Sequence, residues 1–234
     1  MLKTYPRNPF KSFHPCLVLR MPLLLCAATE FEITETRQFI QQQQLQNKIS
    51  ILITGVGLMA AAYALTKAVY TQKPSFILQA GVAGSFSKAF PLASVAVVKE
   101  EIIGDSGVEE NGKFLSLFDM NLADSNVLPW QQGRLINTNK VVNECGLPIA
   151  NAITVNEITT TENRIHFYRT TMNANLESLE GAALHYIALM ENIPFLQLRA
   201  VSNFAGERDK KKWALGTSIA ALNNALQQQL LKLI

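Results

Sequence analysis

Two polar residues that directly follow apolar, strand-like runs are best suited to do chemistry in this sequence. Glu180 follows the run 175–179, and Asn203 follows the run 195–202. In open α/β sheets, ligands bind outside the carboxyl ends of the strands. If the two runs are neighbouring strands, a carboxylate and an amide meet there, where they suit the paired hydroxyls of a sugar and a heterocyclic base. The sequence therefore predicts a nucleoside pocket.

Two further carboxylates, Glu30 and Glu32, come directly after the first apolar run. Carboxylates at a helix start commonly do no more than interact with the helix macrodipole, and this interpretation stays open. Alternatively, Glu32 turns inward and polarises a water nucleophile, which requires a carboxylate within hydrogen-bond reach of that water. Glu177 is either solvated or a secondary contact.

Two glycine-containing turns, 55–57 and 81–84, follow predicted strands. The first turn, together with Ala60, matches the GxGxxA dinucleotide fingerprint. That motif also needs an acidic residue at the end of the next strand, where this chain has Gln79 and Gly81. A nicotinamide enzyme is therefore disfavoured, and we expect the glycines to let the backbone approach a sugar or a neighbouring loop.

Short apolar runs alternate with amphipathic stretches, which is typical of a mostly parallel sheet covered by helices. The predicted strands are 23–28, 49–54, 75–80, 94–101, 134–137, 152–156, 175–179 and 195–202. The predicted helices are 32–44, 58–71, 161–171, 181–191 and 213–233. Residues 104–128, rich in Asp, Ser, Asn and Gly, are interpreted as a functional loop over the site.

Composition and charge argue against several classes of protein. The formal net charge is only +3 over 234 residues, without a basic stripe interleaved with aromatics, so nucleic acid is not an expected partner. Cys16, Cys26 and Cys145 are scattered, which favours a reducing compartment and a cytoplasmic location. The histidines and cysteines have no metal-ligand spacing, and no apolar run reaches membrane-spanning length, so neither a metal nor a membrane is expected.

We expect one domain over residues 21–234, preceded by a disordered extension over residues 1–20. The extension is basic and contains three prolines. A signal peptide is disfavoured because Glu30 and Glu32 follow the apolar run 21–28 at once. Met21 is a candidate natural start.

Taken together, these residues resemble the nucleoside phosphorylase and nucleosidase superfamily. The segment 27–32 (Ala-Ala-Thr-Glu-Phe-Glu), both glycine turns, the run 179–183 and the run 201–203 follow in the family's order. The resemblance extends from Met21 to the end of the sequence. It implies a single-domain α/β fold, built as a three-layer sandwich around a central mixed, mostly parallel sheet. It also implies a homo-oligomer that binds a small-molecule nucleoside without cofactor or metal.

Within this superfamily the chain looks most like the futalosine hydrolases, through the segments 104–109, 177–183 and 206–209. Adenine-releasing relatives have Asp where this chain has Asn203, and an amide suits the 6-oxopurine of futalosine. Phosphorylases have Arg and Ser where this chain has Gln79 and Val82. A phosphate dianion has little to hold it there, so the resemblance implies hydrolysis. Leu179 stands where relatives often have Met, and both residues are apolar.

The implied reaction is hydrolysis of the N-ribosidic bond of futalosine, a step of menaquinone biosynthesis, releasing hypoxanthine and dehypoxanthine futalosine. In this assignment, Glu32 activates water, Asn203 stabilises the departing base, and Glu180 holds the 2′- and 3′-hydroxyls. The other implied substrate-binding residues are Leu179, Gly57, Gly81, Val82, Ser202 and Ile158, and Arg208 or Trp213 could close over the substrate.

Several alternatives stay open. The carboxyphenyl end of the substrate is unassigned among Arg208, Arg134 and Arg169. The chain could also be another purine nucleosidase, a nucleoside phosphorylase, or a nucleoside-binding protein without turnover.

Overall fold

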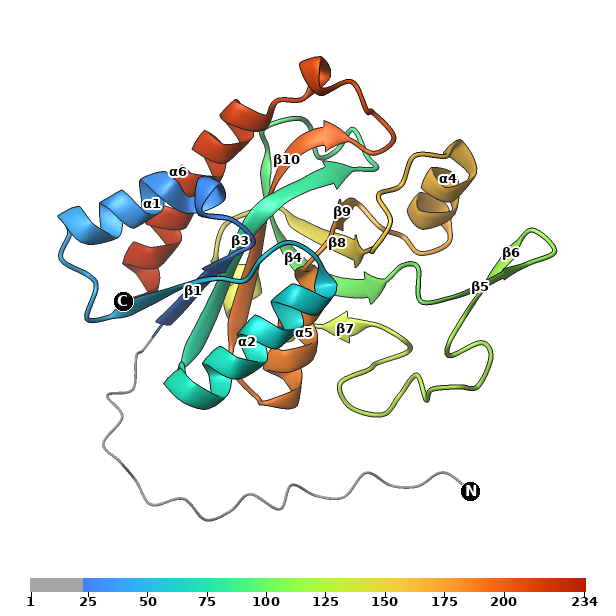
Figure 1. Cartoon of the computed structure of the whole chain (residues 1–234), viewed down its shortest axis with the longest axis horizontal. Coiled ribbons are helices and arrows are strands. Elements are labelled where there is room, and N and C mark those ends of the chain that lie inside the picture. Colours follow the sequence, from blue (N-terminus) through green and yellow to red (C-terminus); the bar gives the residue numbers. More distant parts are fainter. Residues whose placement is uncertain (1–22) are drawn as a thin grey trace, which may run out of the picture.

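Strands and helices alternate along residues 23–234, the part of the chain that the computed structural model describes (Figure 1). The strands are β1 (Leu23–Ala27), β2 (Ile49–Ile53), β3 (Phe76–Ser85), β4 (Val95–Ile103), β5 (Gly107–Glu110), β6 (Lys113–Ser116), β7 (Leu135–Ile136), β8 (Ile149–Thr154), β9 (Leu176–Ser178) and β10 (Phe195–Phe204). The helices are α1 (Glu30–Gln42), α2 (Leu58–Gln72), α3 (Val141–Glu144), α4 (Glu162–Thr170), α5 (Gly181–Met190), the 3₁₀ helix η1 (Lys210–Lys212) and α6 (Leu215–Leu233). The extension predicted over residues 1–20 lies outside the described residues.

Strand β1 shows why the central runs are apolar at every position. Leu23 and Leu25 pack in a cluster with α1 and α6, whereas Leu24 and Cys26 pack in a second cluster with α2 and α5. Strands that are buried on both faces need apolar side chains on both. Figure 1 shows α1 and α6 together on one side of β1 and β3, with α2 and α5 on the other. Among the described residues, no helix is both long and apolar enough to cross a membrane.

The larger sheet is mixed, as predicted, but it is not an open layer. Five of its eight strand pairings are parallel, and β3, β9, β8, β4 and β10 pair in a closed ring. The ring closes because β3 is long: its residues 76–80 pair with β1, and Gly84 and Ser85 pair with β9. The predicted three-layer sandwich is therefore corrected, since helices flank β1 and β3 but the sheet closes on itself beyond them.

Two predictions about the sheet's edge were wrong. Residues 81–84 form the second half of β3 rather than a glycine turn, because β10 continues to pair with them. The strands associated with Glu180 and Asn203 are not neighbours, because β3 lies between β9 and β10; β9 runs antiparallel to β3, and β10 runs parallel to it. Glu180 comes after β9, whereas Asn203 is the last residue but one of β10, and these two strands run in opposite directions.

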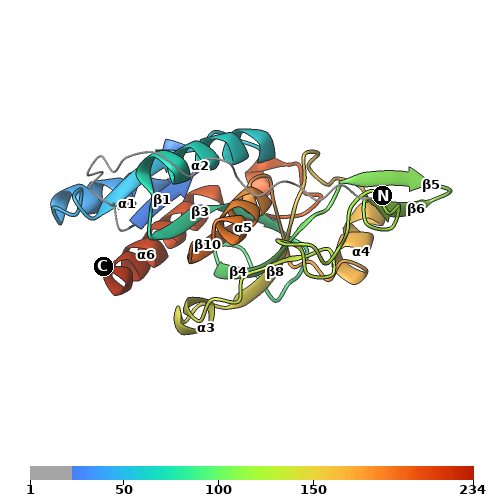
Figure 2. The same cartoon turned by 90° about the horizontal axis from the view of Figure 1, so that it is seen from below.

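Every predicted helix and strand is present, with ends shifted by a few residues, but the predicted loop 104–128 was wrong in part. It contains the antiparallel hairpin β5–β6, which Figure 2 shows projecting at the far end of the molecule from the C-terminus. Thr161 directly precedes α4, and its side chain makes no capping hydrogen bond. Asp209 caps η1 by accepting from Lys211 N–H at 3.0 Å.

A buried amide joins the first helix to the last. Asn223 on α6 accepts through Oδ1 from Thr36 N–H at 2.9 Å and from Thr36 Oγ1 at 2.7 Å. Its Nδ2 donates to Glu32 O at 2.9 Å, a carbonyl that borders the non-helical residue Ile33 inside α1. Asn223 therefore fixes the backbone at Glu32 from a position 191 residues later in the chain.

We expect Asn223→Ala to lower the free energy of unfolding by about 2–4 kcal/mol, because buried polar groups on Thr36 and Glu32 lose their partner. Urea unfolding followed by circular dichroism measures this change. Asn224→Ala, at the exposed next residue of the same helix, should change stability by no more than about 0.5 kcal/mol. Equal effects of the two substitutions would contradict the role of Asn223.

Candidate active site

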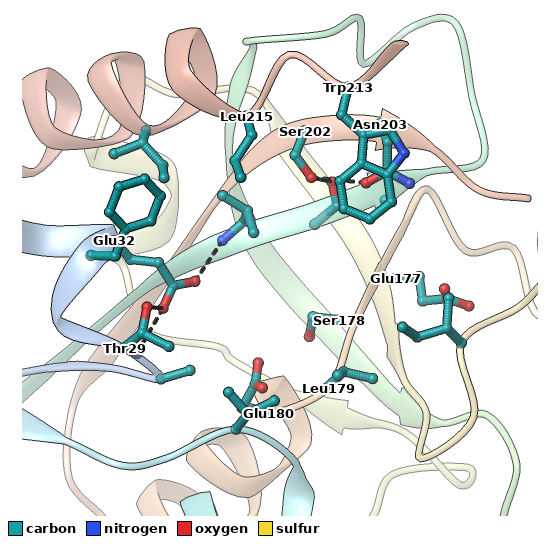
Figure 3. Close-up of a pocket in the computed structure, with 18 of the residues that line it drawn as sticks. Thr29, Glu32, Glu177, Ser178, Leu179, Glu180, Ser202, Asn203, Trp213 and Leu215 are labelled. Atoms are coloured by element: carbon teal, nitrogen blue, oxygen red, sulfur yellow. Dashed lines mark hydrogen bonds between the residues drawn. The ribbon is translucent and has the colours of Figure 1, made fainter. Parts of the chain in front are cut away.

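The predicted site residues surround a cavity of about 330 Å³ between α1, the end of β10 and the start of α5 (Figure 3). Seven of the nine predicted site residues line it, together with segments before and after them. The lining residues are Ala28, Thr29, Phe31, Glu32, Val56, Val82, Ala83, Gly84, Ile158, Glu177, Ser178, Leu179, Glu180, Ser202, Asn203, Arg208, Trp213, Leu215 and Ile219. None of these comes from residues 104–128, so the prediction of a loop over the site was wrong.

Glu32 faces this cavity, whereas Glu30 does not. Glu30 pairs with Arg37 at 2.6 Å on the surface. Glu32 is 8% exposed, and its Oε2 accepts from Thr29 N–H at 2.9 Å and Thr29 Oγ1 at 3.0 Å, as in a capping box. Its Oε1 accepts from Val82 N–H at 3.2 Å, the dashed line that reaches β3 in Figure 3. These donors hold the carboxylate in one orientation at the cavity wall.

Glu180 is held in place by a backbone donor and a buried charge. It is 7% exposed, and its Oε1 accepts from Gly57 N–H at 3.0 Å. Its Oε2 lies 3.7 Å from Nη1 of Arg199, a buried guanidinium that also donates to Gln79 Oε1 at 3.1 Å. The sequence offered a signal for Arg199, a charged residue inside an apolar strand, because arginine is almost never fully buried without a partner.

Asn203 presents an oriented amide at the end of β10. Its Oδ1 accepts from Ser202 Oγ at 2.8 Å, and its Nδ2 donates to Phe204 O at 3.0 Å. One hydrogen on Nδ2 and one lone pair on Oδ1 stay available to a ligand. Figure 3 shows the ring of Trp213 beside this amide.

Glu177 is a third carboxylate at the cavity. It is buried and accepts from the backbone and the hydroxyl of Thr159. Burial raises the pKa of the Glu177 carboxyl, although the Thr159 hydrogen bonds and the charge of Arg208 oppose this shift. Of the two alternatives left open for Glu177, the solvated position is therefore excluded, and Glu177 lies at the cavity wall.

Gly57 and Gly81 do not line the cavity, which differs from their predicted contact with a substrate. Gly57 has φ +96°, a conformation that favours glycine, and its N–H binds Glu180. Gly81 makes room for the guanidinium of Arg199, which a β-carbon there would overlap. Both glycines support the carboxylate wall from behind.

A buried polar layer lies beneath the first turn of α5. Glu101 accepts from Gln197 Nε2 at 2.8 Å and from Thr154 Oγ1 at 3.0 Å, and Thr154 Oγ1 in turn accepts from Ala182 N–H at 2.8 Å. Burial raises the pKa of Glu101 to about 7, against the opposing effects of Gln197, Arg199 and Thr154. This layer fixes the helix start that directly follows Glu180.

Two larger cavities lack this convergence of groups. One, of about 640 Å³, is lined mainly by aromatic and apolar residues, with Arg134 donating to Glu100 and to Met172 O. The other, of about 690 Å³, lies around α4. Among residues 23–234, no group of three or more His, Cys, Asp or Glu side chains is arranged to hold a metal ion.

Comparisons with known proteins give both a family and a fold. Residues 20–233 match the sequence profile of the Phosphorylase superfamily. The chain is 29% identical over 182 residues to the futalosine hydrolase of Thermus thermophilus, covering 76% of this chain and 80% of that protein. It is 29% identical over 197 residues to the futalosine hydrolase of Streptomyces coelicolor, covering 82% of each.

Solved structures share the fold at low sequence identity. The 5′-methylthioadenosine/S-adenosylhomocysteine nucleosidase of Neisseria meningitidis, in complex with methylthio-immucillin-A, superposes with a TM-score of 0.74 at 16% identity, covering 90% of this chain and 98% of that chain. A mutant futalosine hydrolase of Helicobacter pylori superposes with a TM-score of 0.72 at 14% identity, covering 91% and 99%. At such identities the likeness shows a shared α/β fold.

We expect Glu101→Gln to become more stable relative to the wild type as the pH rises. An ordinary glutamate ionises near pH 4.5 and Glu101 near pH 7, so between these values the folded state keeps a proton that the unfolded state has lost. As the pH rises from about 4.5 to 7, Glu101 therefore lowers the free energy of unfolding of the wild type by at most about 3 kcal/mol. The neutral amide of Glu101→Gln does not titrate, so the variant does not lose this stability.

Urea unfolding of both proteins at pH 5, 6, 7 and 8 measures this difference. His185 is also buried, with its pKa lowered to about 3, but both proteins contain it and its effect cancels. Glu110→Gln, at an exposed carboxylate, should give a difference that does not change with pH. A pH-independent difference for Glu101→Gln would contradict the prediction.

Proposed function

This chain belongs to the Phosphorylase superfamily, and we propose that within it the chain hydrolyses the N-ribosidic bond of futalosine, releasing hypoxanthine and dehypoxanthine futalosine. The observation that carries the proposal is the convergence of Glu32, Glu180 and Asn203 on one cavity. The names of the two curated relatives support the choice of substrate. The reaction would be a step of menaquinone biosynthesis.

Glu180 would hold the ribose. Each carboxylate oxygen has one protein partner, Gly57 N–H on Oε1 and Arg199 beside Oε2, so lone pairs remain for the 2′- and 3′-hydroxyls. Hydrogen bonds from a diol to a carboxylate are charge-assisted and therefore strong. The negative charge would also stabilise the oxocarbenium-like sugar that forms as the bond to the base breaks.

Glu32 would orient and deprotonate the attacking water. Its three donors leave one lone pair on Oε1 for the water, at the wall of the cavity. A carboxylate held in this way can accept the proton as the oxygen attacks C1′. General base catalysis of this kind contributes roughly 10²- to 10⁴-fold in rate.

Asn203 would receive the base. An amide cannot donate a proton as a carboxylic acid can, but it pairs its N–H and C=O with the O6 and ring N–H of a 6-oxopurine. Negative charge moves onto the purine as the bond breaks, and the Asn203 Nδ2–H group would stabilise it. Ile158 and Leu179 supply apolar contacts in the same cavity.

Water is favoured over phosphate as the nucleophile because, among the described residues, the only cation that lines the cavity is Arg208, which lies over the Trp213 ring and is not paired with Glu32. Val82 has no side-chain donor, and Gln79 lies below the cavity, bound to Arg199. Arg199 is itself engaged by Glu180 and buried. A phosphate dianion placed beside Glu32 and Glu180 would be repelled by both carboxylates, and Arg199, which is paired with Glu180, is not free to compensate it.

Hypoxanthine release from futalosine, with and without phosphate and alongside inosine and methylthioadenosine, tests the proposal. We expect release from futalosine that is independent of phosphate. A requirement for phosphate would indicate a phosphorylase, and faster turnover of another nucleoside would overturn the substrate. Tight binding without release of any base would indicate a nucleoside-binding protein.

We further propose that the enzyme is a cytoplasmic homo-oligomer that acts on a small-molecule nucleoside without a cofactor. The scattered cysteines favour the location, with Cys26 and Cys145 present as free, buried thiols. Oligomeric state and location remain predictions from the sequence and its family.

We expect Glu32→Gln to lower kcat about 10²- to 10⁴-fold, with KM changed by no more than a few-fold. The amide still accepts from Thr29 but takes no proton from water. Glu30→Gln is the matched control, because it removes a neighbouring exposed carboxylate, and it should retain wild-type turnover. Near-normal kcat in Glu32→Gln would remove Glu32 from this role.

We expect Asn203→Asp to raise KM for futalosine about 10- to 100-fold, because the ionised carboxylate has no N–H to offer the purine O6. The variant should gain measurable release of adenine from methylthioadenosine. Asn224→Asp adds the same charge on α6 away from the cavity and should have no effect. Unchanged futalosine kinetics without adenine release would show that Asn203 does not read the base.

A further inference from the structure

Arg208 is the only cationic side chain among the described residues that line the cavity. The two other arginines considered for the far end of the substrate lie elsewhere. Arg134 lines the aromatic cavity, paired with Glu100 at 3.2 Å, and Arg169 is exposed in the last turn of α4. The structure thus separates three candidates that the sequence left equivalent.

The guanidinium of Arg208 is available to a ligand. Within residues 23–234 it makes no hydrogen bond or ion pair, and its Cζ lies 5.7 Å from the centroid of the Trp213 ring. The nearby carboxylate of Glu207 is engaged by Lys212 at 2.8 Å, and Trp213 Nε1 donates to Glu207 O at 3.0 Å. These contacts fix the position of the indole on which Arg208 rests. They leave the N–H donors of the Arg208 guanidinium free.

Because the cavity is lined by carboxylates, an anionic ligand needs a cationic side chain such as Arg208 to bind there. Three carboxylates, Glu32, Glu177 and Glu180, line the walls; among them only Glu180 forms a salt bridge with Arg199, and the charge of Arg208 acts on Glu177. A carboxylate brought in with the substrate would be repelled by the unpaired acids unless a cation met it. Arg208 is the group that can do so.

We propose that Arg208 binds the carboxylate of the substrate's carboxyphenyl group, with the Trp213 ring as the apolar surface beside the phenyl ring. The inference rests on the proposed function, which supplies an anionic aryl substrate. A guanidinium matches a carboxylate with two parallel N–H donors, and stacking on an aromatic face holds its plane in place. Arg208 is then a specificity-determining residue.

Steady-state kinetics with futalosine and its methyl ester, which lacks the negative charge, test this assignment. We expect the wild type to have a lower KM for the acid than for the ester. Arg208→Gln should raise KM for the acid roughly 10- to 100-fold and leave KM for the ester and both kcat values nearly unchanged. Arg208→Lys should recover part of the loss. Lys210→Gln, which removes a charge outside the cavity, is the matched control and should behave as the wild type.

The outcomes separate this assignment from the proposed function. Equal increases in KM for acid and ester in Arg208→Gln would show that Arg208 acts through Glu177 or the loop, and would overturn the assignment alone. Kinetics of Arg208→Gln identical to those of Lys210→Gln would also overturn the assignment alone. Absence of hypoxanthine release by the wild type would overturn the proposed function and the assignment with it. If Arg208→Gln fails to fold, the wild type decides, because equal KM values for acid and ester exclude carboxylate recognition.

Discussion

The guanidinium of Arg199 is 1% exposed, and a charge buried so completely has to be compensated within the protein. The carboxylate of Glu180 and the amide oxygen of Gln79 do this at 3.7 and 3.1 Å. Because Glu180 directly precedes α5, the ion pair fixes where that helix begins relative to β3 and β10. The space for the guanidinium comes from Gly81, where any side chain would overlap it.

The same carboxylate therefore serves the fold and the site. Glu180 compensates a buried charge and also lines the cavity, and Glu32 likewise caps α1 and lines the cavity. Groups fixed by structural hydrogen bonds need little reorganisation when a ligand binds, which is the basis of electrostatic preorganisation. Glu101 extends this arrangement below α5, close to Gly181, which must be small to accommodate it.

Local hydrophobic patterns in the sequence predicted the strands and helices of this fold. They did not predict which strands pair with one another. Runs such as 23–28 identified strands because burial on both faces demands apolar residues throughout. The ring closure rests on only two residues of β3 pairing with β9, which no local pattern reveals. The hairpin β5–β6 was missed because its strands are short, four residues each, and none of these residues is buried. Glu32, Glu180 and Asn203 were found because each carries a polar group after a buried run. The support of Glu180 by Arg199 was missed because Arg199 comes from a different strand, β10.

The bond between Asn223 and the Glu32 carbonyl has a consequence for how the protein is made. Chains fold as they are synthesised, with N-terminal segments emerging first. Here an early residue at the cavity receives its support from α6, 191 residues later. A nascent chain can form β1, β2 and α2 while it is still attached to the ribosome, but the wall that carries Glu32 stays incomplete until the last helix has emerged. The cavity is thus assembled only once translation has passed α6.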